Sequence, residues 1–256
     1  MYQENSIYNK PEVYDLHFND RKREMLHEYY KRILEGKEIY TIHDCSYGTG
    51  NLTDELARMG YKVSGSDLSS SMIQQGVEKN RQEGLAIDLT QCDFRNLTNH
   101  IHNQFDCVMS TGNSLAHVSN DDVKIALKEM TSLIKDGGYI YIDLRNWDRI
   151  LETNQRFFYY PPIIKDNERI NTIQVWDYNL DGTMTFNLLY TFEKDHQIYH
   201  REEFKVVYYP LKKDFLIQEL KNLGFKDICI MNFIHDHIKD FNNMEWYVIM
   251  AKKSID

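Results

Sequence analysis

The first residues that could do chemistry lie in the segment 42–50, which reads IHDCSYGTG. An apolar run ends there at Asp44, and Gly48 and Gly50 follow within six residues, with Ser46 between them and the acid. Glycine lets a backbone approach a ligand closely and turn into a helix. A glycine pair alone is equally compatible with an ordinary turn before a helix. The segment therefore indicates a ligand-binding loop only in combination with other residues.

Acidic residues close the next two apolar runs as well. Asp67 ends the run 62–67, and Asp93 ends the run 87–93. If these runs are parallel strands, their carboxyl ends share one edge of a sheet, where open α/β sheets bind ligands. A carboxylate at Asp67 can accept both ribose hydroxyls of a nucleoside, and Asp93 can accept from an adenine amino group, with Phe94 bordering the base. The alternatives are a helix N-cap at Asp67 and a solvated loop acid at Asp93.

The charge of this predicted site selects among nucleoside ligands. A dinucleotide site would have a third glycine at position 53, where this chain has Thr53, and it would hold an anionic pyrophosphate. Acids at three successive strand ends suit a cation instead, and Asp44 can orient the loop and help to hold an ammonium group. No Walker lysine follows the glycines. The pattern predicts S-adenosyl-L-methionine, which carries a sulfonium and an ammonium, as the cofactor.

Alternating strands and helices must position these residues. We expect strands at 40–44, 62–67, 87–93, 105–110 and 139–144, and helices at 51–59, 70–83 and 121–134, with Gly137-Gly138 ending the last helix. This alternation predicts right-handed crossovers and a parallel sheet. After Arg145 the runs 170–179, 183–192 and 198–209 alternate β-branched or aromatic residues with polar ones, which is typical of a half-exposed antiparallel meander. A helix at 213–223 and strands at 228–233 and 246–252 follow.

The predicted fold class is therefore α/β, a doubly wound, mostly parallel seven-stranded sheet with an antiparallel β insertion after the fifth strand. We divide the chain into an N-terminal arm or lid at 1–39, with a helix from about residue 21 to 34, and one domain at 40–256. Within that domain, residues 155–210 form the insertion that covers the substrate. No linker rich in proline or serine separates two independent domains.

Composition restricts the partners. The net charge of −9 and the pI near 5.6 argue against a nucleic-acid partner, which needs a basic face. The chain has no apolar run long enough to span a membrane and begins without a secretory signal, and its four cysteines are widely spaced. These features predict a cytoplasmic protein with reduced thiols. His235-Asp236-His237 lacks helical ligand spacing and further ligands, so we predict no metal site.

Two further segments resemble a known family. FDCVMSTGNSLAH at 105–117 is similar to the fourth-strand motif of the glycine N-methyltransferase family, and GGYIYIDLRNWD at 137–148 to its fifth-strand motif. FKVVYYP at 204–210 resembles the last insertion strand of that family, and Ser46 stands where many methyltransferases have their first glycine. The resemblance runs from about Tyr40 to the C-terminus and is looser in the insertion and the arm. It implies a class I, Rossmann-like, S-adenosylmethionine-dependent N-methyltransferase.

The resemblance also implies roles for individual residues. Arg145 would hold the carboxylate of a glycine-like substrate, with a surface ion pair to Asp143 or Asp148 as the alternative. Asn113 would contact the substrate, and the remaining residues implied at the reacting amine are Tyr208, Tyr190 and Tyr160. Arg23 of the arm, with Arg21 as the alternative, would reach the cofactor carboxylate. The other implied cofactor neighbours are His117, Leu68, Met72, Ser110 and Tyr14.

From these observations we expect methyl transfer to the amine of a small amino acid, glycine or sarcosine favoured, by in-line displacement. Two alternatives stay open. One is an N-methyltransferase for another small amine, such as an amino sugar or a biosynthetic intermediate, in which Arg145 has no substrate role. The other is a cofactor-binding module without catalytic activity. The partner we expect is a small molecule, and self-association into a homo-oligomer stays open.

Overall fold

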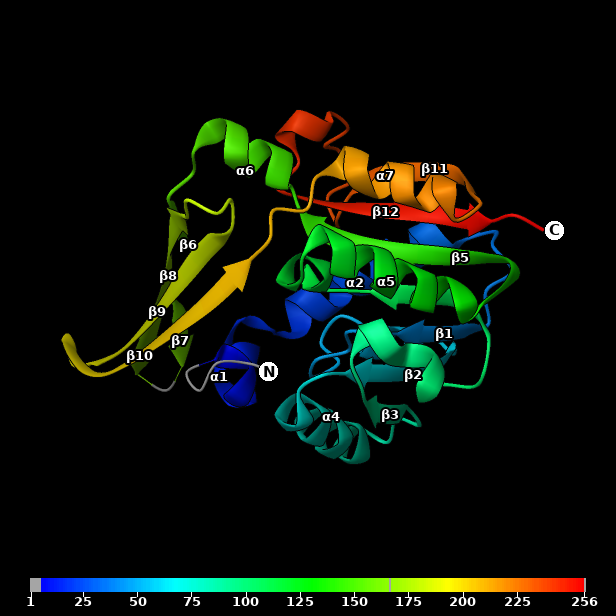
Figure 1. Ribbon diagram of the computed structural model, residues 1–256. Coiled ribbons are helices and arrows are strands. Elements are labelled where there is room, and N and C mark those ends of the chain that lie inside the picture. The colour runs from blue at the N-terminus through cyan, green and yellow to red at the C-terminus, as the bar shows by residue number, and fades with distance from the viewer. Residues whose placement is uncertain (1–5, 166, 256) are drawn as a thin grey trace.

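The computed structural model describes residues 6–165 and 167–255. Within these residues seven strands form a core sheet in the order β11-β12-β5-β4-β1-β2-β3 (Figure 1). The sheet is parallel from β3 to β5, and β12 runs antiparallel to both β5 and β11. The strands are β1 (Thr41–Asp44), β2 (Lys62–Asp67), β3 (Asp88–Gln91), β4 (Phe105–Ser110), β5 (Ile134–Arg145), β11 (Phe225–Asn232) and β12 (Trp246–Lys253). The predicted mostly parallel seven-stranded sheet is confirmed.

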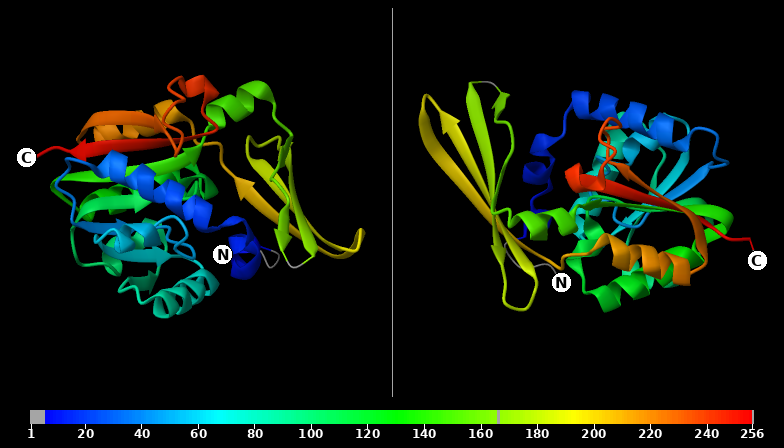
Figure 2. Two further views of the ribbon diagram at one scale, coloured as in Figure 1. Left: turned by 180° about the vertical axis from the view of Figure 1, so that it is seen from behind. Right: turned by 90° about the horizontal axis from the view of Figure 1, so that it is seen from above.

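Helices cover both faces of the core sheet. α2 (Asp20–Leu34) lies on one face, and α5 (Asn120–Ser132) and α7 (Lys213–Asn222) lie on the other (Figures 1 and 2). The buried side of α2 carries Leu26, Tyr30 and Ile33, which belong to the same apolar cluster as α3 (Asp54–Arg58). α4 (Ser70–Glu83) ends at Gly84, whose φ of 68° gives the left-handed cap that glycine favours. The helices predicted from apolar spacing at about 21–34, 70–83, 121–134 and 213–223 therefore correspond to α2, α4, α5 and α7.

The Gly137-Gly138 prediction is wrong. Helix α5 ends at Ser132, and β5 has already begun at Ile134, so the glycines lie inside the strand. The pairing of β4 with β5 shifts register beside them. A Cβ at Gly138 would come within 2.9 Å of two backbone oxygens, those of Asp106 and Lys135. The glycine pair therefore permits a strand irregularity and does not cap the helix.

The helix predicted at 51–59 is shorter in the structure. It begins only at Asp54, because the backbone from Gly50 to Thr53 is occupied by turns that complete the glycine loop. Both Thr53 N and Asp54 N donate to the Gly50 carbonyl. The loop therefore uses residues that the apolar periodicity had assigned to the helix.

A second sheet follows β5 and α6 (Trp147–Thr153) at one end of the molecule. Its strands are β6 (Phe157–Tyr159), β7 (Ile163–Lys165), β8 (Glu168–Tyr178), β9 (Met184–Lys194) and β10 (Gln197–Tyr208). All the pairings are antiparallel, and β9 joins β10 through Asp195 and His196, both with positive φ, as a two-residue hairpin turn requires. The short edge strands β6 and β7 were not predicted. One face of the sheet is buried along alternate residues, including Trp176, Phe186 and Tyr208.

The N-terminal arm lies between the two sheets (Figure 2). It consists of η1 (Ile7–Asn9), α1 (Pro11–Tyr14) and η2 (Asp15–His17) before α2 begins. Three more 3-10 helices, η3 (Phe94–Asn99), η4 (Ser114–His117) and η5 (Phe241–Asn243), follow strands of the core sheet or precede β12. No helix among the described residues is long and apolar enough to cross a membrane.

Candidate active site

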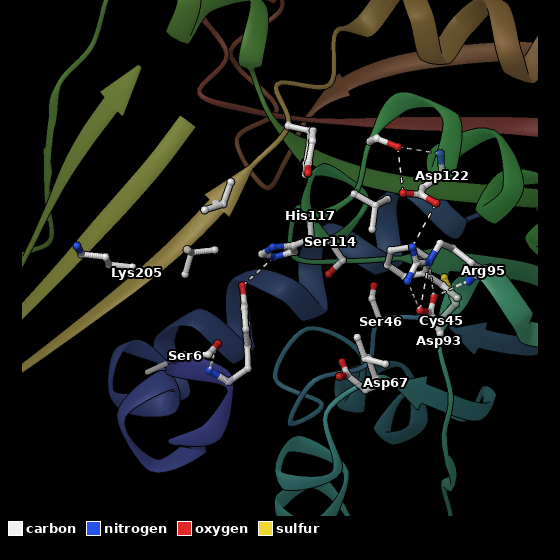
Figure 3. Close-up of a pocket in the computed structure, with 18 residues that line it drawn as sticks. Ser6, Cys45, Ser46, Asp67, Asp93, Arg95, Ser114, His117, Asp122 and Lys205 are labelled. Carbon is white, nitrogen blue, oxygen red and sulfur yellow. Dashed lines mark hydrogen bonds and ion pairs between the residues drawn. The ribbon is translucent and has the colours of Figure 1, made fainter. Parts of the chain in front are cut away.

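Two adjoining pockets open at the carboxyl ends of β1, β2 and β4, and Figure 3 shows the residues that line the larger one. The larger has a volume of about 350 Å³ and the smaller about 40 Å³. Both are lined by Tyr8, Ser46, Asp67, Ser114 and His117. Together they make one cleft along the edge at which the sequence placed its strand-end acids.

Asp44 holds the glycine loop in place through hydrogen bonds. Its carboxylate is fully buried and accepts from Ser46 N at 3.0 Å, from Thr111 Oγ1 at 2.7 Å and from the Thr53 hydroxyl. Burial raises the pKa of this carboxyl, and the hydrogen bonds act against that rise. The contacts join the loop after β1 to the loop after β4. A direct contact between Asp44 and a cofactor ammonium stays a prediction.

Tyr47 fixes the shape of the glycine loop because its ring packs into space left free by two glycines outside the loop. Its hydroxyl contacts Asp54 and accepts from Asn80 Nδ2 at 2.9 Å, while its ring lies against Gly65 and Gly76. A Cβ at Gly65 would lie 2.5 Å from the ring, so a side chain there would force Tyr47 to move. Gly50 has a φ of 86° and is equally crowded, which explains why a glycine ends the loop.

Asp67 lines both pockets and is held by the loop that it faces. Its Oδ2 accepts from Gly48 N at 2.9 Å, and its Oδ1 accepts from Ser69 N at 2.8 Å. Burial raises the pKa of the Asp67 carboxyl to about 6, against the opposing effect of these two hydrogen bonds. The backbone donors leave further lone pairs on both oxygens, which can accept ribose hydroxyls.

Asp93 lines the larger pocket, where it forms an ion pair with Arg95 that the sequence did not predict. Arg95 grips both carboxylate oxygens, with Nη2 at 2.6 Å from Oδ2 and Nε at 3.0 Å from Oδ1, and its Nη1 lies 3.2 Å from Asp122 (Figure 3). Burial raises the pKa of Asp93, but the Arg95 contacts outweigh burial and hold it below the usual value. Adenine recognition by Asp93 stays a prediction, in competition with this guanidinium.

The other predicted cofactor residues divide between the cleft and its surroundings. Leu68, Phe94 and His117 line the larger pocket, and Gly48, Tyr14 and Met72 line the smaller one. Two others do not line the pockets but contact residues that do: Ser110 Oγ is 3.3 Å from Ser46 Oγ, and Gly50 N donates to the Tyr47 carbonyl in the turn that closes the loop.

Arg23 is not brought to the cleft. It pairs with Asp20 at 3.3 Å and with Glu83 at 3.6 Å, and Glu83 lies at the end of α4 remote from the pockets. The alternative, Arg21, is exposed. Both belong to the first turn of α2, which starts only after the arm has left the cleft.

The arm supplies residues that the sequence did not point to. The Tyr8 hydroxyl lies 2.8 Å from His117 Nε2, and Asp15 Oδ1 accepts from Thr49 Oγ1 and Asn51 Nδ2, both at 2.6 Å. Burial lowers the pKa of His117 to about 4, so its ring is neutral at ordinary pH. These partners lie more than thirty residues apart, and no local periodicity signals them. Ser114 was accessible to prediction, because it follows Asn113 directly in the fourth-strand motif.

Arg145 ends β5 in a nearly buried position, with 8% of its surface exposed. No carboxylate among the described residues lies within ion-pair distance of its guanidinium. The alternative partners are engaged elsewhere: Asp143 accepts from Gly112 N and Asn113 N, and Asp148 accepts from Lys213 N. The surface ion pair considered for Arg145 is therefore absent from the described structure.

Asn113 lies beside Arg145 in a left-handed backbone conformation, with φ of 63°. Its Oδ1 accepts from Arg145 N at 3.1 Å and from Trp147 Nε1 at 3.0 Å. Its buried Nδ2 has no hydrogen-bond partner among the described residues. The Asn113 side chain is nevertheless close enough to Tyr208 to lower the pKa of that phenol, against the larger rise that burial causes. Asn113 Nδ2 is thus a buried donor without an acceptor among the described residues, next to an arginine that has no carboxylate partner there.

Of the three predicted tyrosines, Tyr190 and Tyr208 lie on strands β9 and β10 of the second sheet, and Tyr160 directly follows β6. Burial raises the pKa of Tyr208, while the charge of Arg145 acts against that rise, and the Tyr208 ring lies 4.6 Å from His117. Tyr160 stacks on His17 at 4.4 Å, and Tyr190 lies 6.4 Å from the same imidazole. Tyr208 therefore lies near Asn113 and Arg145. Tyr160 and Tyr190 instead share a neighbour in the arm, the ring of His17.

Comparison with known proteins identifies the enzyme class of the chain. Residues 42–138, which contain the glycine loop and all three strand-end acids, match the methyltransferase domain family. A solved S-adenosylmethionine-dependent methyltransferase from Clostridium acetobutylicum has the same fold, with a TM-score of 0.77 at 20% identity over 97% of this chain and 100% of that one. The chain is an S-adenosylmethionine-dependent methyltransferase. The predicted enzyme class and cofactor are confirmed.

Two other likenesses bear on the acceptor. A glycine/sarcosine N-methyltransferase from Aphanothece halophytica is 29% identical over 231 residues, covering 88% of this chain and 81% of that protein. The methyltransferase therefore resembles the glycine N-methyltransferase type, as predicted. An S-adenosylmethionine-bound amino pentose methyltransferase from Micromonospora echinaspora shares the fold, with a TM-score of 0.74 at 11% identity over 99% of this chain and 98% of that one.

Proposed function

We propose that this methyltransferase acts on the amine of a small amino acid, with glycine or sarcosine favoured, and that Arg145 binds the substrate carboxylate. The observation that carries the proposal is the nearly buried guanidinium without an anionic partner among the described residues. A buried charge is costly unless it is paired and hydrogen-bonded. A ligand carboxylate would supply the missing partner.

Asn113 supports the same orientation of the ligand. Its Oδ1 is fixed by Arg145 N and Trp147 Nε1, so the direction of Nδ2 is fixed as well. A carboxylate that accepts two hydrogen bonds from the Arg145 fork would have an oxygen lone pair left for Nδ2. The two residues therefore hold one end of a small amino acid and leave its amine free to face the cofactor cleft.

The remaining site residues align the reactants. When bound, S-adenosylmethionine supplies an electrophilic methyl group on a sulfonium. Tyr14 lines the smaller pocket next to Gly112, and Tyr208 lies between His117 and the donors of Arg145 and Asn113. Holding reacting groups in line can contribute about 7–11 kcal/mol to the lowering of the barrier. A neutral amine needs no strong general base, and burial keeps these tyrosine hydroxyls protonated as hydrogen-bonding groups.

The names of the relatives agree with this acceptor. The Aphanothece halophytica protein is a glycine/sarcosine N-methyltransferase, and its likeness covers 88% of this chain. The second candidate is another small amine, which the likeness to an amino pentose methyltransferase favours. A neutral amino sugar would leave the Arg145 charge without an anion, so the first candidate fits the site better.

The test uses labelled cofactor with glycine, sarcosine and dimethylglycine separately, followed by product masses, beside a panel of neutral amino sugars. Arg145→Ala should leave cofactor binding nearly unchanged and lower kcat/KM for glycine about 100-fold through a higher KM, because a charge-assisted contact of about 3 kcal/mol is lost. Arg156→Ala is the matched control, because that arginine is exposed just before β6 and pairs with Asp177 on β8.

Full glycine activity in Arg145→Ala would falsify the proposed substrate orientation. Methylation of an amino sugar, without any of glycine or sarcosine, would favour the second candidate. Cofactor binding in a calorimeter without product from any of these amines would contradict both candidates and point to an acceptor outside the panel.

A further inference from the structure

Four aromatic rings surround the Arg145 guanidinium. Its Cζ lies 4.9 Å from the ring centre of Trp246, 5.4 Å from Trp176, 5.5 Å from Phe158 and 5.6 Å from Phe186. All four are within the range of cation–π attraction. These rings, here called the aromatic cage, account for the low exposure of a charged side chain.

The cage is assembled from both sheets. Phe158, Trp176 and Phe186 belong to β6, β8 and β9 of the second sheet, and Trp246 is the cross-strand partner of Arg145 at the start of β12. The three rings of the second sheet are nearly parallel, at 7° between Phe158 and Trp176 and 11° between Trp176 and Phe186. Trp176 Nε1 donates to Gln174 Oε1 at 3.0 Å, which fixes that indole.

The cage affects how strongly the guanidinium attracts different ligands. Aromatic faces stabilise a cation by about 0.5–1 kcal/mol at exposed sites and by about 2 kcal/mol when water is excluded. They cannot accept the in-plane hydrogen bonds of the arginine fork, so those donors stay available for a carboxylate. Low polarity around the charge also strengthens its attraction to an anion far more than to a neutral group.

We propose that the aromatic cage determines specificity for a carboxylate-bearing amine over a neutral amine of the same size, with Trp246 as the positioning residue that holds Arg145. This inference rests on the proposed function. Trp246 acts through Arg145 and does not touch the reacting amine. Removing its ring lets water reach the guanidinium and lets the fork turn, so carboxylate binding weakens while the methyl-transfer step is preserved.

The experiment compares glycine with glycinamide as methyl acceptors in wild type, Trp246→Ala and Trp246→Phe. Trp246→Ala should raise the KM for glycine about tenfold, with kcat within about twofold, and should change kcat/KM for glycinamide less than twofold. Trp246→Phe restores a ring and should bring the glycine KM to within about threefold of wild type. Tyr139→Leu is the matched control, because it removes a ring that Lys252 approaches at the far end of the same strand pair.

Binding of glycolate to the cofactor-loaded enzyme, followed by calorimetry, gives a readout independent of turnover. It should weaken about tenfold in Trp246→Ala and not in Tyr139→Leu. If Trp246→Ala does not fold, Phe158→Leu removes a cage ring from the other sheet and should lower the glycine-to-glycinamide ratio in the same direction.

The possible failures are separable. Wild type that neither methylates glycine or sarcosine nor binds glycolate contradicts the proposed function itself. Wild type that methylates glycine through Arg145, with an unchanged glycine-to-glycinamide ratio in the folded cage variants, overturns the role of the cage alone. An equal loss of kcat for both acceptors would show a merely structural role and overturns it too.

Discussion

At the residue scale, we predict that Asp67 makes cofactor binding depend on pH. Its carboxyl has a pKa of about 6 because it is buried. Only the ionised form offers acceptors alone, whereas protonation turns one acceptor site into an O–H donor that would oppose a ligand hydroxyl or backbone N–H. We expect the affinity for S-adenosylmethionine to fall as the pH drops through 6. Calorimetric titrations between pH 5 and 8 would measure this fall.

Asp67→Asn is the control for that pH dependence. The variant should bind more weakly at pH 8, because its amide group faces Gly48 N or Ser69 N, which donate to Asp67 in the wild type. Its affinity should no longer change through pH 6. A wild-type affinity that is flat over this range would show that Asp67 does not contact the cofactor.

Asp143 makes a second pH-dependent prediction, this time for stability. Burial and the nearby charge of Asp44 raise its pKa to about 8, and its buried Oδ2 has no hydrogen bond to any described residue. The folded protein therefore keeps a proton here between about pH 4 and 8 that the unfolded chain releases. The contribution of this group to the free energy of unfolding is largest at low pH and is lost as the pH rises toward 8.

Asp143→Asn keeps an oxygen for Gly112 N and Asn113 N and removes the titrating proton. Its free energy of unfolding, relative to wild type, should rise between pH 5.5 and 8.5 in urea titrations. A difference that is the same at both pH values would contradict the assignment.

The residues at strand ends were predictable because the rule behind them is topological. Parallel strands bring their carboxyl ends to one edge, so Ser46, Asp67 and Phe94 line the cleft as their positions implied. His117 also lines it, but that prediction came from the family resemblance. The Arg95 clamp on Asp93 was not foreseen, because it depends on how η3 folds back toward α5. Roles in catalysis and binding for the individual residues remain predictions.

At the element scale, the arm connects the cleft with the second sheet. Asp15 holds the glycine loop through Thr49 and Asn51, and two residues later His17 lies 2.8 Å from Thr172 on β8. Burial lowers the pKa of His17 to about 4, which keeps this contact uncharged. The arm therefore joins the glycine loop to the second sheet, and its Tyr8 and Tyr14 line the smaller pocket.

We expect Asp15→Ala to speed cofactor dissociation by up to about 30-fold, because two hydrogen bonds worth about 1 kcal/mol each would be lost from the arm. Stopped-flow displacement of the bound cofactor would measure the rate. Arg23→Ala is the comparison, since its ion pairs lie outside the cleft, and it should change the rate less than twofold. Equal effects of the two substitutions would show that the arm does not retain the cofactor through Asp15.

Elements with strong periodicity were predictable, and those that depend on distant partners were not. β2, β4 and α4 agree with the sequence residue for residue, since apolar spacing and caps are local signals. The arm carries short 3-10 and α turns whose stability comes from contacts with both sheets. β6 and β7 are three residues each and exist as edges of β8, so alternation within them was too short to recognise.

At the scale of the whole molecule, net charge argues for a small substrate. The protein carries −9 and would be repelled by the phosphates of a folded RNA. We expect no labelled methyl in purified tRNA or rRNA under conditions that label an amine acceptor. Incorporation into RNA that falls steeply with added salt would contradict this, since it would show phosphate contacts on a local basic surface.

The packing of Tyr47 against Gly65 and Gly76 has a consequence for how this protein can evolve. A ring from the loop after β1 fills the space that side chains on β2 and α4 would need. A larger residue at position 65 is tolerable only after Tyr47 has been replaced by a smaller residue. If position 65 changes first, its new side chain clashes with the Tyr47 ring. Mutational histories of this enzyme are therefore ordered at these positions, and the residues should change together when related sequences are compared.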